Sequence, residues 1–239
     1  MRPVFLSFIL AATLCAQAKR PIEEFKTKDG PLRLTPIRHA SLMLEAGGQV
    51  VHVDPWSQGN YDGLPPADVI LITDIHGDHL DAAIVDKLKK PGTVILAPEA
   101  VAAKLGGVTV IRNGETKTAG KWSFEAVPMY NLKRGPAEGK VFHDKGRGNG
   151  YVIAYGGMRL YVSGDTEGVP EMRGLKNIDV ALVCMNLPYT MPPEEAADAV
   201  RAFQPKIVYP YHYRGSDLAV FEKALAGTKT EVRSRDWYY

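Results

Sequence analysis

Short apolar runs of strand length, separated by turn residues, dominate the first part of the chain. They occupy residues 32–39, 41–47, 49–55, 67–73 and 92–98. The last two runs are continuously apolar, which is typical of strands that are covered on both faces. Gly47 and Gly48 lie between two of the earlier runs and indicate a hairpin turn. This part of the chain therefore predicts a sheet.

A second series of apolar runs begins after residue 107. These runs occupy residues 108–111, 122–130, 150–155, 158–165, 179–185 and 206–212. Gly156 and Gly157 predict another hairpin. The intervening segment 131–150 is rich in glycine and charge, and it predicts a long loop of the kind that often carries function.

Three segments have apolar residues at helical spacing, and they span residues 80–90, 192–204 and 216–227. Pro91-Gly92 follows the first segment and predicts its end, while Ser216 is the expected N-cap of the last. Each half of the chain is thus rich in strands and also contains helices. We expect an α+β fold in which two sheets pack face to face with helices outside, a four-layer αββα sandwich.

The first 18 residues differ from the rest and resemble a secretory signal peptide. They have a basic start, an apolar core over 4–14 and an Ala-x-Ala pattern that predicts cleavage after Ala18. We therefore expect a periplasmic or secreted mature domain of residues 19–239. The alternatives are a lipid anchor on Cys15 or a retained anchor. The apolar core is too short for a comfortable membrane span, so the mature chain is expected to have none.

Composition and charge narrow the classes of partner. The chain has 239 residues, of which 45% are hydrophobic and 23% are charged, as in ordinary globular proteins. A formal net charge of +2 gives no electrostatic reason to expect nucleic acid or an anionic membrane as a partner. A small-molecule substrate is the expected partner. Cleavage after Ala18 would leave Cys184 as the one cysteine, so no intramolecular disulfide is expected.

The most informative motif directly follows the apolar run 67–73. Asp74, His76 and Asp78 are spaced by two residues, so they can point to one side of an extended segment, and His79 follows. Gly77 permits a turn that a Cβ would hinder. Mixed carboxylate and imidazole ligands suit Zn²⁺, and also Fe or Mn²⁺.

One loop cannot surround metal ions by itself, so further ligands are expected from other strand ends. Asp165 follows the apolar run 158–162, and His212 follows the run 206–211. His143 lies in the long loop. His39 also follows a strand and is a weaker candidate to border the site. Four separate segments therefore each offer an acidic or imidazole group.

Together these motifs resemble the metallo-β-lactamase superfamily, and in particular the branch of metal-dependent hydrolases similar to the ascorbate-phosphate lactonases. The resemblance rests on "IRHASLMLE", "DPW", "DIHGDH", "SGDT" and "PYHY", which occur in this order along almost the whole mature chain. It implies the αββα fold and a metal-activated water that attacks an ester, lactone, amide or phosphodiester bond. Asp78 or Asp165 would pass the proton to the leaving group.

The resemblance also implies a ligand set. One metal position would use Asp78, His79 and His212, and Asp165 would bridge two ions. The other position would use His76 and Asp74, with Asp74 standing where the superfamily usually has histidine, and either His143 or Asn131 would complete it.

The aspartate at position 74 leaves three interpretations open. The site holds two ions with Asp74 as a ligand, or one ion held by Asp78, His79, Asp165 and His212, or no metal. A carboxylate in place of imidazole also shifts the preference towards harder ions such as Mn²⁺. The alternatives to hydrolysis are an iron-dependent oxidoreductase of the same fold and a metal-free binding protein.

Residues at the expected mouth of the site are candidates for substrate contact. Trp56 and Tyr61 lie in a loop that follows a strand, and so do Tyr189 and Thr190. The long loop is rich in basic residues, among them Lys133, Arg134, Lys145 and Arg147. A solvated loop is the favoured interpretation for these, and a clamp for an anionic substrate is the alternative.

Overall fold

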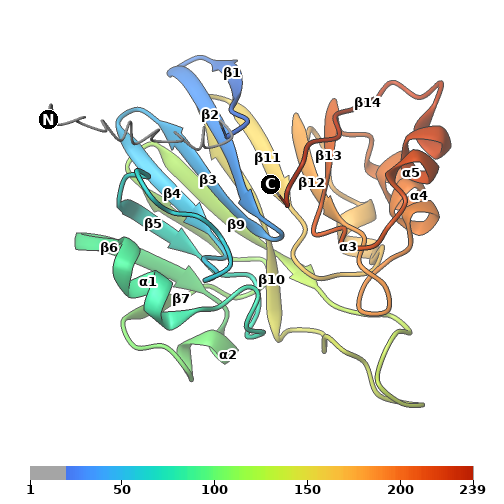
Figure 1. Ribbon diagram of the computed structural model, residues 1–239, viewed down its shortest axis with the longest axis horizontal. Helices are drawn as coiled ribbons and strands as arrows, with labels where there is room; N and C mark the ends of the chain where they lie inside the picture. Colours follow the sequence, from blue (N-terminus) through green and yellow to red (C-terminus); the bar gives the residue numbers. More distant parts are fainter. Residues whose placement is uncertain (1–19, 239) are drawn as a thin grey trace, which may run out of the picture.

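Two seven-stranded sheets pack face to face, and the helices lie on their outer sides (Figure 1). The computed structural model describes residues 20–238. The predicted signal peptide lies outside the described residues. Among residues 20–238, no helix has the length and apolar character needed to cross a membrane.

The first sheet follows the order of the sequence from one edge to the other. Its strands are β1 (Glu23–Thr27), β2 (Gly30–Arg38), β3 (Ser41–Ala46), β4 (Gln49–Val53), β5 (Ala67–Leu71), β6 (Lys89–Ala97) and β7 (Val108–Val110). Strands β1 to β4 pair antiparallel, and β4 to β7 pair parallel. Helices α1 (Ala82–Leu88) and α2 (Glu99–Ala102) belong to this half of the chain.

The second sheet repeats this plan. Its strands are β8 (Thr116–Ala119), β9 (Trp122–Met129), β10 (Gly148–Tyr155), β11 (Met158–Val162), β12 (Val180–Cys184), β13 (Ile207–Tyr211) and β14 (Glu231–Val232). Strands β8 to β11 pair antiparallel, and β11 to β14 pair parallel. Helices α3 (Pro170–Arg173), α4 (Pro193–Phe203) and α5 (Leu218–Leu225) cover its outer side (Figure 1).

The main hydrophobic core lies between the two sheets. It joins Leu34 and Val51 of the first sheet to Phe124 and Leu182 of the second, and all four are fully buried or nearly so. A smaller core lies under α1 and α2 on the outer face of the first sheet. Because each sheet is covered on both sides, its central strands are continuously apolar, as the sequence predicts.

The predicted sandwich is confirmed, and both predicted hairpins are present. Ala46 pairs with Gln49, and Tyr155 pairs with Met158. The prediction was wrong at Pro91-Gly92, because α1 ends earlier at Leu88 and β6 runs through the proline and glycine. A register shift in the pairing of β5 with β6 accommodates them at the start of the strand.

The expected N-cap of the last helix was also wrong by one residue. Asp217 caps α5 by accepting a hydrogen bond from the Ala219 backbone N–H at 3.0 Å. The Ser216 hydroxyl instead donates to the Met185 carbonyl at 2.5 Å. Ser216 therefore ties α5 to the end of β12, next to the loops described below.

Candidate metal centre

The carboxyl ends of the parallel strands bring the predicted ligands together. The segment Asp74–His79 follows β5, Asp165 follows β11, and His212 follows β13. His143 comes from the long loop between β9 and β10. The carboxyl ends of parallel strands lie along the same end of their sheet. Because the two sheets face each other, these strand ends lie close together. The result is a cluster in which every predicted metal ligand takes part.

The deeper part of this cluster consists of Asp78, His79, Asp165 and His212, and we call it the inner cluster. His79 Nε2 lies 3.3 Å from Asp165 Oδ2, and His212 Nε2 lies 3.3 Å from Asp165 Oδ1. Asp78 Oδ2 lies 3.5 Å from His212 Nε2. The His79 and His212 rings are stacked, with centroids 5.1 Å apart. Nitrogen and oxygen atoms thus converge on one point from three strand ends.

Several converging atoms of the inner cluster are buried and have no hydrogen-bond partner in the described part of the chain, namely His79 Nε2, His212 Nε2 and Asp165 Oδ1. Buried polar atoms normally have partners, because leaving them unpaired costs free energy. Imidazole nitrogen and carboxylate oxygen are the usual protein ligands of zinc. This donor set therefore fits a divalent metal ion.

The electrostatics of the inner cluster also favour a cation. Burial would raise the pKa of Asp165, but His212 and His79 hold it well below its usual range. Burial would lower the pKa of His79, but Asp165 and Asp54 raise it well above its usual value. The carboxylates therefore stay ionised and stabilise positive charge at this point.

Asp54 orients His79, a role that was not predicted from the sequence. It follows β4 and is fully buried. Its Oδ1 accepts from the Thr73 backbone N–H at 2.7 Å, and its Oδ2 lies 2.8 Å from His79 Nδ1. With Nδ1–H donated to Asp54, His79 presents Nε2 to the inner cluster. The available signal was an acidic residue directly after a buried strand, in "DPW".

A second group, Asp74, His76 and His143, lies beside the first, and we call it the outer cluster. Asp74 Oδ2 is 2.6 Å from His76 Nδ1 and 3.8 Å from His143 Nε2. The His76 side chain is 45% exposed. His143 Nε2 is also 3.4 Å from Asp165 Oδ2, so Asp165 adjoins both clusters.

Asn131 supports His143 from behind. His143 Nδ1 lies 2.6 Å from Asn131 Oδ1, and the His143 backbone N–H donates to the same oxygen at 2.9 Å. The Asn131 amide group donates to Glu167 and to the Tyr189 carbonyl. Of the two candidates for the last position, the structure therefore brings His143 into the cluster and uses Asn131 to orient it.

Asp74 already has a cationic partner within the protein. Arg147 Nε and Nη2 donate to its two oxygens, each at 3.2 Å. Burial would raise the pKa of Asp74, but the hydrogen bond from His76 and nearby positive groups, including Arg147, lower it to about 2. Asp74 is thus an ionised carboxylate that is paired on both oxygens.

His39 joins the site from the end of β2, which the ligand set implied by the resemblance did not include. Its Nε2 lies 3.3 Å from Asp78 Oδ2, and its ring centroid is 3.6 Å from that of His212. Its Nδ1 lies 2.6 Å from the Tyr238 hydroxyl. Burial lowers the pKa of His39 to about 4, so its imidazole is neutral near pH 7. The signal in the sequence was a histidine that directly follows a strand.

A pocket of about 680 Å³ opens above these clusters. Its lining combines His39, His76, Asp78, His143 and Asp165 with Phe142, Asn186, Leu187, Pro188, Tyr189 and Arg214. Within the inner cluster, the side chain of Asp78 is partly exposed to solvent, at 32%. The chemistry of the clusters is therefore accessible from solvent.

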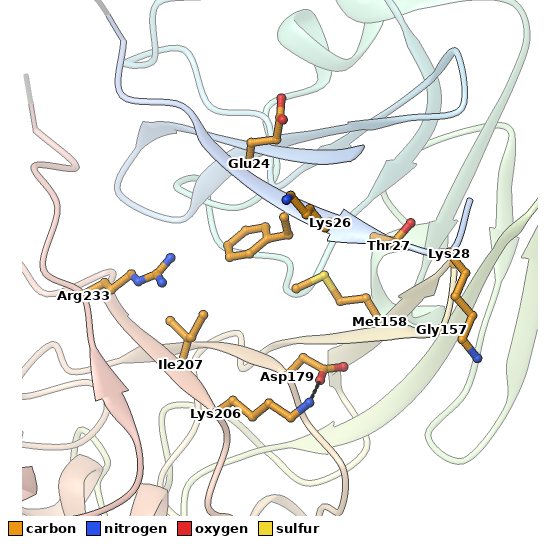
Figure 2. A pocket seen from close by; sticks show the side chains of 12 residues that line it. Glu24, Lys26, Thr27, Lys28, Gly157, Met158, Asp179, Lys206, Ile207 and Arg233 are labelled. Atoms are coloured by element: carbon orange, nitrogen blue, oxygen red, sulfur yellow. Dashed lines mark ion pairs between the residues drawn. The ribbon is translucent and has the colours of Figure 1, made fainter. Parts of the chain in front are cut away.

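Another pocket, of about 570 Å³, lies at the opposite end of the strands, between β1 and β13 (Figure 2). Figure 2 shows Ile207 and Met158 beside it, and its Asp179 forms an ion pair with Lys206 at 2.7 Å. No histidine lines this pocket. This pocket therefore lacks the imidazole groups that line the pocket above the metal-ligand clusters.

The four residues predicted at the mouth occupy different places. Tyr189 lines the pocket, while Trp56 lies beside it, with its ring centroid 5.5 Å from that of His39. Tyr61 is buried in the core under α1, and its hydroxyl accepts from the Trp56 backbone N–H at 2.8 Å. Thr190 is buried and accepts from the Asn186 backbone N–H at 2.7 Å. Tyr61 and Thr190 thus shape the loops from behind and do not line the pocket.

Four of the basic residues of the long loop have acidic partners. The pairs are Lys133 and Arg134 with Glu195, Lys145 with Glu171, and Arg147 with Asp74. The Glu195 pairing fixes the start of the loop to α4. Lys133 and Lys145 remain largely exposed to solvent, whereas Arg134 and Arg147 are mostly buried. All four charges already have a carboxylate partner within the protein.

Comparison with known proteins agrees with this geometry. The family model described as "Beta-lactamase superfamily domain" matches residues 33–212. Over 214 residues, the chain is 34% identical to a UPF0173 metal-dependent hydrolase of Thermococcus onnurineus, which covers 81% of this chain and 92% of the relative. The chain belongs to the metallo-β-lactamase superfamily and, within it, to the UPF0173 metal-dependent hydrolase family.

Solved structures show the same relationship. The chain is 43% identical to a Parabacteroides distasonis protein named as a metal-dependent hydrolase, with a TM-score of 0.86 over 91% of this chain and 99% of that one. A metallo hydrolase from Ignicoccus hospitalis is 24% identical, with a TM-score of 0.71 over 86% of this chain and 95% of that chain, and it shows a shared fold alone.

Proposed function

We propose that this protein hydrolyses an ester, lactone, amide or phosphodiester bond of a small molecule with a metal-activated water. The observation that carries this proposal is the convergence of His79 Nε2, His212 Nε2 and Asp165 Oδ1, which are buried and have no hydrogen-bond partner among residues 20–238. Asp165 also lines the pocket. Zinc is the first candidate ion, and Mn²⁺ or iron is the alternative.

The residues divide between two metal positions. Asp78, His79, Asp165 and His212 would hold the first ion, and Asp74, His76 and His143 would hold a second, with Asp165 adjoining both. Held by these residues, a divalent ion would supply a water with a pKa lowered towards ~7 and would polarise the bond under attack.

The chain's own groups would carry the remaining steps. Asp54 fixes the His79 ring so that Nε2 faces the inner cluster. Asp78 faces the pocket and can take a proton from water and pass it to the leaving group. Asp165 is almost completely buried, and its position between His79, His143 and His212 suits a bridging role.

A substrate panel combined with metal analysis tests this function. Purified protein would be assayed with added Zn²⁺ or Mn²⁺ on esters, lactones, amides and phosphodiesters, including a phosphorylated lactone because the sequence resembles the ascorbate-phosphate lactonases. We expect one or two metal equivalents and turnover that Asp165→Asn removes. Asp86→Asn, which alters an exposed carboxylate on α1, is the matched control.

Two outcomes would contradict the proposal. Protein that binds no metal and cannot be reconstituted would support a metal-free binding function. Bound iron with redox activity and no hydrolysis would support an oxidoreductase.

We further propose a periplasmic or secreted location on the basis of the N-terminal segment. Sequencing of the N-terminus of the exported protein should find cleavage after Ala18. A mature protein that retains residues 1–18 would contradict this.

A further inference from the structure

Arg214 differs from the other basic residues around the site. It follows β13 in the loop after His212, and it is the one lysine or arginine lining this pocket in the described part of the chain. Within residues 20–238, no ion pair involves its guanidinium group, whereas Lys133, Arg134, Lys145 and Arg147 of the long loop have acidic partners. Arg214 therefore lines the pocket as a positive group without an acidic partner among the described residues.

Two aromatic rings hold the Arg214 guanidinium beside the ligand clusters. Its Cζ lies 5.9 Å from the Trp56 ring centroid and 5.8 Å from that of Tyr238. The same two rings adjoin His39, at centroid distances of 5.5 and 5.7 Å. Stacking on rings positions a guanidinium group while its N–H donors stay available in the plane. Trp56 and Tyr238 thus lie next to both Arg214 and His39. The N–H donors of Arg214 remain available to bind an anion.

Another part of the pocket lining is apolar. Leu187 and Tyr189 are exposed to 50% and 46%, which is unusual for large apolar residues in this protein. Phe142 packs edge-on against Tyr189 with ring centroids 5.1 Å apart, and Pro188 completes the surface. Exposed apolar groups gathered in a pocket favour an apolar ligand group, because binding removes them from water.

We propose that Arg214 recognises an oxyanion of the substrate, while Phe142, Leu187 and Tyr189 bind an apolar group of the same molecule. This inference rests on the hydrolytic function proposed above and narrows it to amphiphilic substrates. Such a substrate carries a carboxylate or phosphate and an apolar group, and the bond to be cleaved lies near Asp78 and Asp165. A planar guanidinium group suits both oxyanions, because it can donate two parallel hydrogen bonds.

Tryptophan fluorescence provides a binding test that does not require turnover. Trp56 is half-buried beside Arg214, whereas Trp122 and Trp237 are buried. The probes are 4-phenylbutyrate, 3-phenylpropyl phosphate and the neutral isostere 4-phenylbutyramide, titrated into the full-length, metal-loaded protein. We expect at least one anionic probe to bind about tenfold or more tightly than the amide. The carboxylate and phosphate arms identify which oxyanion is preferred.

Substitutions assign that preference to Arg214. Arg214→Gln should weaken the anionic probe about tenfold and leave the amide unchanged, and Arg214→Lys should be intermediate because it keeps charge but loses the planar fork. Arg33→Gln is the matched control, since it removes the same charge from an exposed arginine that pairs with Glu24. Equal affinity of wild type and Arg214→Gln for the anions would overturn the proposal, as would the absence of any anion preference in the wild type.

The apolar surface has its own test. Leu187→Asn should weaken all three phenyl probes and leave the affinity for acetate unchanged. If the phenyl probes bind this variant as tightly as wild type, the apolar part of the proposal is wrong.

A hydrolysis comparison separates this inference from the proposed function. Mono-4-nitrophenyl glutarate and its methyl ester differ in one carboxylate. We expect Arg214→Gln to raise the KM of the first and to leave the second unchanged. Anion binding that depends on Arg214, without hydrolysis of any ester, lactone, amide or phosphodiester, would contradict the proposed function alone. Hydrolysis with no effect of Arg214→Gln would contradict this inference alone.

Discussion

The inner and outer clusters contain similar residue types, but their polar atoms differ in the hydrogen-bond partners that they have within the described part of the chain. In the inner cluster, His79 Nε2, His212 Nε2 and Asp165 Oδ1 lack hydrogen-bond partners. In the outer cluster, Arg147 engages both oxygens of Asp74, and His76 lies 2.6 Å from one of them. A cation in the inner cluster would meet donor atoms that have no other partner, whereas one in the outer cluster would compete with Arg147.

This difference shows that residue type and proximity do not by themselves define a metal site. What distinguishes the two clusters is the number of ligand atoms left without a partner. We therefore expect two ions of unequal affinity, with the tighter ion in the inner cluster. Stepwise chelation followed by elemental analysis should remove the ions in two stages, and a single stage would contradict the distinction.

The largest expected effect is that of Asp165→Asn, because Asp165 adjoins both clusters. Its Oδ1 faces His212, and its Oδ2 faces His79 and His143. An amide removes the negative charge from the middle of the site. We expect loss of bound metal, measured by elemental analysis, and a fall in turnover of about 10³-fold or more. Retention of the tighter ion would contradict this assignment, and circular dichroism would check the fold.

Asp54→Asn should have the next largest effect and should act on the inner cluster alone. An amide at this position does not hold the Nδ1–H of His79 as a carboxylate does, so the ring would lose its preferred tautomer. We expect the affinity for the tighter ion to fall about 10- to 100-fold, measured by competition with a chromophoric chelator. If the weaker ion alone is affected, the orienting role of Asp54 is wrong.

Arg147→Gln should strengthen the outer cluster. Removal of the guanidinium group leaves the Asp74 carboxylate ionised and unpaired, so the weaker ion should bind about tenfold more tightly. The same chelator competition measures this, and the tighter ion should be unchanged. Arg173→Gln, which removes a similar arginine–aspartate pair at the surface, is the control. Weaker binding of the second ion would show that Arg147 supports the site and does not compete with the ion.

Glu167→Gln should have the smallest effect on metal binding. Glu167 is buried and accepts the backbone N–H groups of Leu132, Lys133 and Arg134, which fixes the loop that carries His143. We expect a several-fold weaker second ion and a free energy of unfolding lower by about 1–3 kcal/mol. Chemical denaturation measures the latter. Unchanged metal affinity together with lower stability would restrict Glu167 to a structural role.

The sequence predicted the parts of the molecule that depend on local pattern. Continuous apolar runs predicted the central strands, and polar residues at strand ends predicted the segments that carry Asp74, Asp165 and His212. Parallel strands in facing sheets necessarily bring such ends together, so the approximate site followed from the fold. The short edge strands β1, β8 and β14 were not predicted, because they have few residues and little apolar alternation.

Features that depend on how distant loops close could not be predicted. The Arg147–Asp74 pair joins residues 73 positions apart, and nothing near either residue indicates the other. Tyr61 lies in a loop that follows a strand, as expected for a residue at the mouth of the site. Its ring is nevertheless buried in the core under α1. His39 was expected as a weaker candidate to border the site, but its contacts with Asp78 and His212 depend on how the two sheets pack. The contact of Asp54 with His79 likewise joins two segments that are distant in the sequence.

The ligands of the inner cluster come from both halves of the chain. Asp78 and His79 follow a strand of the first sheet, whereas Asp165 and His212 follow strands of the second. An ion bound there would link the two sheets, so its binding free energy would stabilise the folded state of the whole domain. Metal supply would then determine how long the protein persists in its folded form as well as whether it is active.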